Sequence, residues 1–174
     1  LHPEAAGTRA TNELSDLWGE NRVDLVVMSN FLHEIDPREW KDHFAATAKV
    51  LKDTGVLIVM EDQEPPIGEL PTREGFNVLD LAAFRELFGQ TTEVRKLVED
   101  ERLTAYEVPR RLLAEYDGSH LAEALRMTVV RAKRAMQAIR EGQLGTPQSR
   151  GRRHAFYAML YASAQMVVDG IPGA

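Results

Sequence analysis

The chain has 174 residues, of which 44% are hydrophobic and 28% are charged, a composition typical of one globular domain and not of a disordered or fibrous protein. The absence of cysteine excludes a disulfide framework and a thiolate metal site, and it favours a cytoplasmic protein. No apolar run approaches the roughly 20 residues of a membrane-spanning helix, so we expect no membrane role.

The net charge of -6 is unevenly divided along the chain. Residues 110–174 carry ten Lys and Arg against five Asp and Glu, and residues 1–109 carry eleven against twenty-two. An acidic first part makes nucleic acid an unfavourable ligand. The basic second part either contacts phosphates or docks on the acidic part, and the second interpretation is favoured.

A strand is predicted over residues 23–29, a continuous apolar run rich in valine. Such runs are typical of an interior strand that is covered on both faces of a sheet. The run ends in the polar residues Ser29 and Asn30, at the end of a strand where ligands of parallel α/β sheets bind.

A helix follows, because Asp36 can cap its free amide groups and Pro37 is tolerated in its first turn. Gly55 is predicted to end it. Its apolar residues recur at spacings of four, four and three and form one stripe facing the sheet: Trp40, Phe44, Ala48 and Leu51.

Residues 56–60 are predicted to form a second buried strand, followed by Glu61 and Asp62 at the same rim as the first polar strand end. Residues 63–77 contain several prolines and glycines, which predicts a long loop of the kind that serves as a lid or binding segment. Together with Glu64 and Glu69, the two acids bind an amine or cationic substrate or form a solvated rim, and the solvated rim is favoured.

An amphipathic helix is predicted over residues 78–88, then strands over residues 93–98 and 103–108 joined by a polar turn. The predicted fold is therefore α/β, with parallel strands and a C-terminal antiparallel hairpin, followed by two α-helices. No His or Asp spacing predicts a metal site.

The last part of the chain, residues 118–174, is predicted as a helical extension of a domain over residues 1–117. Its helices are expected over residues 120–140 and 152–169, and the second is so apolar that it requires this core or another subunit as partner. A basic cluster opens it: Arg150, Arg152, Arg153 and His154.

Three short motifs share one order along the chain: DLV at residues 24–26, NFLH at residues 30–33 and LKDTG at residues 51–55. In this order they resemble the fourth strand, and the turn into the fifth strand, of a class I S-adenosylmethionine-dependent methyltransferase. The resemblance covers residues 21–108 and implies the C-terminal half of a Rossmann-like fold, whose sheet finishes with a helix and an antiparallel hairpin.

The resemblance implies methyl transfer from S-adenosylmethionine to a small molecule. Ser29, Asn30 and Phe31 would line the cofactor and the transfer site, and His33 would take a proton from a substrate hydroxyl. Glu61, Asp62 and Glu69 are the candidate substrate-binding residues. The alternative interpretation is that the polar strand end satisfies backbone groups and that the histidine is a packing residue.

The glycine-rich turn and the ribose-binding acid of that family have no counterpart before Asn21. Because the chain also begins at Leu1, we interpret it as a fragment of a longer enzyme, a processed product or an incomplete gene model. The alternative is a non-catalytic, truncated Rossmann-like module that acts through a partner chain or as a homodimer through its C-terminal helices.

Overall fold

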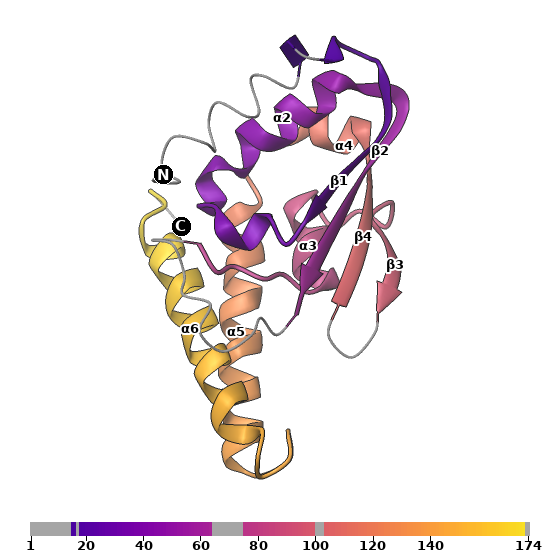
Figure 1. Ribbon diagram of the computed structural model, residues 1–174. Helices are drawn as coiled ribbons and strands as arrows, with labels where there is room; N and C mark the ends of the chain where they lie inside the picture. Colours follow the sequence, from indigo (N-terminus) through magenta and orange to yellow (C-terminus); the bar gives the residue numbers. More distant parts are fainter. Residues whose placement is uncertain (1–14, 17, 64–74, 100–102, 173–174) are drawn as a thin grey trace, which may run out of the picture.

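The computed structural model describes residues 15–16, 18–63, 75–99 and 103–172. In this part of the chain one open sheet has the strand order β1-β2-β4-β3, with helices packed on one side and a long helical hairpin beyond its edge (Figure 1). The strands are β1 (Val23–Ser29), β2 (Leu51–Asp62), β3 (Arg95–Glu99) and β4 (Leu103–Pro109). The helices are η2 (Leu32–Glu34), η3 (Pro37–Glu39), α2 (Trp40–Val50), α3 (Leu81–Leu87), α4 (Arg110–Glu115), α5 (Leu121–Arg140) and α6 (Arg150–Asp169).

The sheet is mixed. β1 runs parallel to β2, with Val27 opposite Ile58 and Ser29 opposite Met60. β4 lies antiparallel to both β2 and β3. The predicted α/β class, the two neighbouring parallel strands and the antiparallel hairpin are therefore confirmed. The η3 turn and α2 supply the crossover that a parallel pair requires, and Asp36 caps its start by accepting a hydrogen bond from the backbone amide of Arg38 at 2.9 Å.

The prediction that the first strand is interior and covered on both faces is wrong. β1 is the edge strand of the described sheet, and the side chains of Leu25 and Val27 are 49% and 51% exposed. A parallel strand normally buries both of its faces, and an apolar run is typical of such a strand. Here the face of β1 that carries Leu25 and Val27 is open. Directly opposed residues share a face, so Ile58 and Met60 of β2 lie on that open face as well.

The predicted end of the α2 helix at Gly55 is also wrong. The helix ends at Val50, and β2 starts one residue later. Gly55 lies inside β2 at a bulge, where the register passes from Val23 opposite Leu51 to Leu25 opposite Val56. A Cβ on this glycine would lie 2.9 Å from the carbonyl oxygen of Lys52, so the glycine serves close backbone approach and not helix termination.

Other predicted boundaries shift by a few residues. The helix expected from residue 78 begins at Leu81, because Asp80 caps it by accepting a hydrogen bond from the amide of Ala83 at 2.9 Å. The long loop of residues 63–77 lies largely outside the described residues. The short helix α4 was not predicted. It follows Pro109, whose fixed φ suits the residue before a helix.

The stripe of α2 faces the core as predicted, except that its last residue, Leu51, belongs to β2. The same core includes residues of α5 and α6, such as Leu125 and Val167, so the helical hairpin and the sheet share one hydrophobic cluster. α6 packs along α5, which confirms that its apolar surface finds a partner within this chain. Among the helices that the structure describes, none has both the length and the apolar character to cross a membrane.

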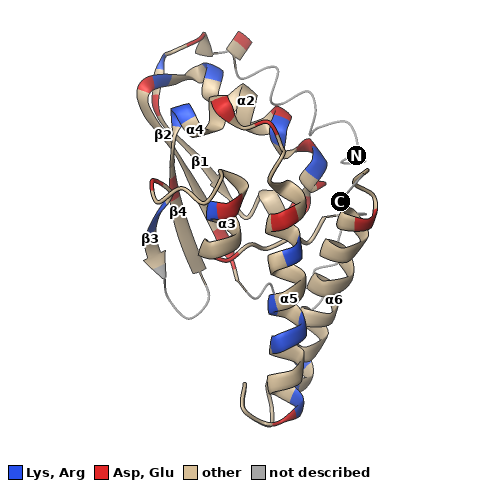
Figure 2. Cartoon of the chain, turned by 180° about the vertical axis from the view of Figure 1, so that it is seen from behind, with Lys and Arg blue, Asp and Glu red and all other residues tan. Residues whose placement is uncertain are grey.

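Several positions along the part of α5 that extends beyond the sheet are Lys or Arg, coloured blue in Figure 2. At the start of α6, Arg150 donates to the carbonyl oxygens of Gly142 and Gly145 at 3.0 and 3.3 Å. The guanidinium of Arg150 therefore stabilises the loop between the two helices. The sequence instead favours docking of this basic part on the acidic first part of the chain, residues 1–109.

Candidate functional site

The carboxyl ends of β1 and β2 lie side by side, and Asn30 joins them. Its backbone amide donates to the carbonyl oxygen of Met60 at 2.8 Å, and its side-chain oxygen accepts from the amide of Asp62 at 2.9 Å. Asn30 has a φ of 48°, in the left-handed region that asparagine tolerates better than most residues. The asparagine therefore turns the chain out of β1 while fixing it to β2.

Glu61 lies beneath this turn and is only 4% exposed. One carboxylate oxygen, Oε1, accepts hydrogen bonds from the backbone amides of Phe31 at 3.1 Å and Leu32 at 2.9 Å. The other, Oε2, contacts Nδ1 of His33. A buried carboxylate needs such donors, and this one receives three from the segment that follows β1.

The imidazole of His33 is fixed between two carboxylates. Its side chain is 2% exposed, with Nδ1 against Glu61 and Nε2 at 3.3 Å from Oε1 of Glu34. Both ring nitrogens can donate hydrogen bonds at the same time only when the imidazole is protonated. A protonated ring has no free lone pair that could accept a proton from a substrate. The carbonyl oxygen of His33 accepts from the amide of Phe76 at 2.5 Å, which ties the segment that begins at residue 75 to this turn.

Glu61 is the residue whose role the sequence analysis missed. The structure gives His33, the predicted base, an orienting partner from the tip of the neighbouring strand. The signal was present in the sequence, because an acid directly after a buried parallel strand lies at the tip of the adjacent strand. A role of His33 in proton transfer stays a prediction, and the geometry adds that a substrate hydroxyl would have to replace Glu34 at Nε2.

The predicted cofactor-lining residues lie together at the rim, next to the free edge of β1. Ser29 and Asn30 are exposed, and Phe31 is half-buried. The ring of Phe31 meets the ring of His43 edge to face at 5.3 Å. His43 is buried, which lowers its pKa below the ordinary 6.5, and in the described residues its Nδ1 has no hydrogen-bond partner.

The predicted acidic group divides in two. Glu61 and Asp62 are buried, so the favoured interpretation of a solvated rim is wrong for these two residues. Glu64 and Glu69 lie outside the described residues. Both oxygens of Glu61 are engaged within the chain, and a substrate-binding role for Glu61, Asp62 and Glu69 stays a prediction.

Of the S-adenosylmethionine site that the resemblance implies, the described residues contain the predicted positions Ser29, Asn30 and Phe31. Ser29 and Phe31 offer a hydroxyl and a ring at the rim, but no strand precedes β1 within the described residues, and hence no glycine-rich turn of that kind lies there. In the same part of the chain, no three His, Asp or Glu side chains gather as a metal ion would require.

Comparison with known proteins gave no matching family model, no matching curated protein and no matching solved structure.

Proposed function

We propose that the chain is the C-terminal half of a class I S-adenosylmethionine-dependent methyltransferase that acts on a small molecule. The observation that supports this proposal best is the pair of parallel strand ends, β1 and β2, with Ser29, Asn30 and Phe31 gathered at their shared rim. Ligands of open α/β sheets bind at this rim.

The topology supports a Rossmann-like assignment of the sheet. A parallel pair linked by a helix is followed by a further helix and an antiparallel hairpin, in the order that the resemblance implies. The motif at residues 30–33 lies in the turn after β1, where the resemblance puts it. The motif at residues 51–55 lies at the start of β2, in the bulge.

In this proposal the residues of the chain act by placement. S-adenosylmethionine, when bound, supplies an activated methyl group, and transfer of that group requires an aligned acceptor more than strong acid or base catalysis. Glu61 accepts hydrogen bonds from the backbone amide of Phe31 and contacts the ring of His33, and the ring of His43 packs against the ring of Phe31. Glu61 is thus proposed as a positioning residue for the rim.

Calorimetric titration of the protein, as its gene encodes it, with S-adenosylhomocysteine tests the proposal. We expect saturable binding that the substitution Ser29→Ala or Phe31→Ala weakens several-fold. The matched control is Ser119→Ala, because Ser119 is also an exposed serine but lies on a different element. Absence of binding, or equal weakening by the control, would overturn the proposal.

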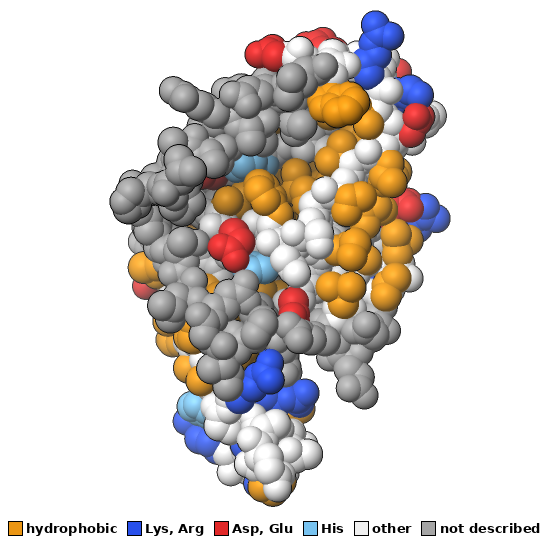
Figure 3. Space-filling model, viewed as in Figure 1, with side chains coloured by type: hydrophobic (Ala, Val, Ile, Leu, Met, Phe, Trp, Pro, Cys, Tyr) orange, Lys and Arg blue, Asp and Glu red, His pale blue; other side chains and the backbone are white. Residues whose placement is uncertain are grey.

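A second candidate function is a non-catalytic module that associates with another copy of the chain. The observation that favours it is the open face of the sheet, defined by Leu25, Val27, Ile58, Met60 and Val98, where hydrophobic side chains gather (Figure 3). Parallel sheets normally bury both faces, and large apolar patches mark interaction surfaces. A protein that binds no S-adenosylhomocysteine and associates through this face would support the module.

A further inference from the structure

The hairpin of α5 and α6 ends in a strongly basic tip, residues 126–154. This segment contains eight Lys and Arg and a single acid, Glu141, which leaves thirteen Lys and Arg against twenty-six acids in the rest of the chain. The structure describes the whole segment, and none of the eight cations is buried in it. Four of them are exposed: Lys133, Arg134, Arg140 and Arg152. The far part of the hairpin extends beyond the sheet, so this positive charge lies at one end of the molecule (Figure 2).

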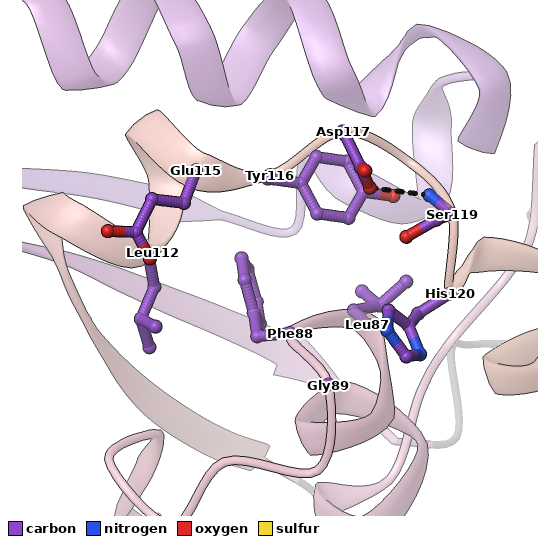
Figure 4. Close-up of a pocket in the computed structure, with 9 residues that line it drawn as sticks. All are labelled: Leu87, Phe88, Gly89, Leu112, Glu115, Tyr116, Asp117, Ser119 and His120. Carbon is purple, nitrogen blue, oxygen red and sulfur yellow. Dashed lines mark hydrogen bonds between the residues drawn. The ribbon is translucent and has the colours of Figure 1, made fainter.

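The length of the hairpin separates the tip from the acids at its base. Glu115 and Asp117 line a cavity of about 240 Å³ beside the start of α5 (Figure 4). The twenty residues of α5 place Arg140 about 30 Å along the helix axis from that start. Exposed charges that lie further apart than about 8 Å are largely screened from each other at physiological ionic strength. The acids at the base therefore do not cancel the positive field of the tip.

The exposed cations of the tip have no ion-pair partner in the described part of the chain. Nearer the sheet, Nη1 of Arg126 lies 3.2 Å from Oε2 of Glu123, and Nε of Arg131 lies 3.9 Å from Oδ2 of Asp80. The side chains of the four exposed cations form no hydrogen bond or ion pair with any described residue. Helix stability does not account for all of them either, because Arg152 lies in the first turn of α6, where a positive charge opposes the helix dipole.

The cations lie on two opposite flanks of the hairpin. On one flank, Nζ of Lys133 lies 5.1 Å from the centre of the Tyr161 ring of α6. Arg152 comes nine residues before Tyr161, which is about two and a half turns of helix, so it lies on the opposite side of α6. Arg140 follows Lys133 by seven residues, about two turns, and shares its side of α5. A flat surface could contact one flank only, so this arrangement suits a partner that surrounds the tip.

The chemistry of the tip favours phosphate groups. Seven of the eight cations are arginine, whose planar guanidinium can bind a phosphate through two parallel hydrogen bonds. An anionic bilayer suits the tip less well, because helices that lie on membranes insert an apolar face. In the hairpin the apolar faces pack on the core, with Ala132 and Leu160 at 0% exposure. Within the tip, Val130 is the one large hydrophobic side chain that is exposed.

We propose that the tip binds the phosphate backbone of a folded RNA. Two packed helices, each about 10–12 Å wide, are together too wide to enter the major groove of DNA, which is about 12 Å wide. A straight DNA duplex would therefore contact one flank of the hairpin. A folded RNA, which proteins recognise largely by shape, presents phosphates around its bends and junctions and can contact both flanks. The proposal does not depend on methyl transfer, since the tip shares no residue with the rim of β1 and β2.

Fluorescence anisotropy of labelled, unfractionated transfer RNA titrated with the full chain tests the proposal. We expect saturable binding with a dissociation constant of about 1–100 μM at physiological salt, as is typical of binding through phosphate contacts alone. The affinity should fall steeply as the salt concentration rises, because each phosphate contact releases counterions. A DNA duplex with the same number of phosphates is expected to bind several-fold more weakly.

A tip variant replaces the four exposed cations with glutamine: Lys133→Gln, Arg134→Gln, Arg140→Gln and Arg152→Gln. It is expected to weaken RNA binding at least about tenfold and to reduce the slope of log affinity against log salt by about three. A matched control variant removes four exposed cations outside the tip: Arg22→Gln, Lys41→Gln, Lys49→Gln and Arg111→Gln. The two variants have the same net charge, and the control should bind RNA as the natural chain does. Both should keep its melting temperature, because surface substitutions change stability little.

Other outcomes would overturn the proposal. Equal weakening by the tip variant and the control variant would mean that net charge, and not the tip, decides binding. DNA that binds as tightly as RNA would exclude a partner that surrounds the tip. Binding to phosphatidylserine vesicles through the tip, without RNA binding, would assign the tip to a membrane surface. Self-association at low salt that the tip variant abolishes, without RNA binding, would mean that the acidic part of a second copy covers the tip.

Discussion

Glu61 makes three contacts to the turn after β1 while being almost fully buried. Its replacement by alanine would leave the amides of Phe31 and Leu32 and the ring of His33 without their acceptor. We expect Glu61→Ala to lower the free energy of unfolding by about 3 kcal/mol, as is typical when one partner of a buried charged pair is removed. Urea denaturation followed by circular dichroism measures this loss.

A graded series makes the test specific to the contacts. Glu61→Gln should cost less than Glu61→Ala, because the amide oxygen can still accept from both backbone amides while the charge is lost. Glu34 faces the same imidazole but is about half exposed, so Glu34→Gln should have little effect. Equal effects of Glu61→Gln and Glu34→Gln would mean that Glu61 does not hold the turn.

His43 makes the stability of the fold depend on pH. Burial lowers its pKa below 6.5, although the charges of Glu39 and Asp42 oppose the shift. Between the lowered pKa and 6.5 the unfolded chain binds more protons at this residue than the folded chain does. The contribution of His43 to stability is therefore complete above pH 6.5 and is lost as the pH falls through the folded pKa.

Two measurements check this dependence. A titration of the His43 ring followed by NMR should give a midpoint below 6.5. As the pH falls below 6.5, the free energy of unfolding of the natural chain should fall more steeply than that of His43→Met, which does not titrate at this position. Parallel slopes for the two proteins would show that His43 does not contribute to acid sensitivity.

At the scale of elements, two glycines of the chain predict opposite effects of the same substitution. Gly55 lies in the β2 bulge, where a Cβ would come within 2.9 Å of the Lys52 carbonyl oxygen and 3.2 Å of that of Asp24. Gly151 lies in α6 with no atom within 4 Å of such a Cβ. We expect Gly55→Ala to destabilise the protein by about 1–3 kcal/mol and Gly151→Ala to stabilise it by about 0.5–1 kcal/mol.

Thermal unfolding of both variants measures the difference. The two changes add the same methyl group, so the comparison separates the local environment from the chemistry of the substitution. A Gly55→Ala variant as stable as the natural chain would show that the bulge relaxes around the new side chain.

Element type was predictable where one periodicity extends over many residues, as in α5, which starts one residue after its predicted start and ends at the predicted residue. Predicted boundaries were wrong where a single specific contact determines where an element begins or ends. Gly55 has the typical signature of a helix end, yet its role depends on Asp24, a residue 31 positions away that only the folded sheet brings near. Likewise, the cap made by Asp80 shortened the predicted α3 helix by three residues.

The rim was predictable because it follows from strand direction alone. Two parallel strands put Ser29, Asn30, Glu61 and Asp62 at one edge, and the structure brings these residues together. The burial of the Glu61 side chain was not predictable. It depends on the turn after β1, whose amides of residues 31 and 32 donate to the Glu61 carboxylate. The short helix α4 was not predicted either.

At the scale of the whole molecule, the helices of residues 18–63, 75–99 and 103–172 pack on one face of a sheet that contains a parallel pair. Met28, Leu57 and Val59 bury their side chains against the helices, whereas Leu25 and Val27 are half exposed on the open face. Each half-exposed side chain forgoes part of the roughly 25 cal/mol gained per Å² of apolar surface buried. A second copy of the chain that covered this face would recover that free energy.

We therefore expect the natural chain to associate as its concentration rises, and the double substitution Leu25→Glu with Val27→Glu to prevent this association. Sedimentation velocity across a range of concentrations measures both. The matched control is Val130→Glu with Met166→Glu, which charges the two large exposed apolar residues of the α5 and α6 hairpin. Loss of association in the control variant instead would locate the contact at the C-terminal helices. A natural chain that stays monomeric at all concentrations would argue against the module, because no second copy of the chain would then cover the open face.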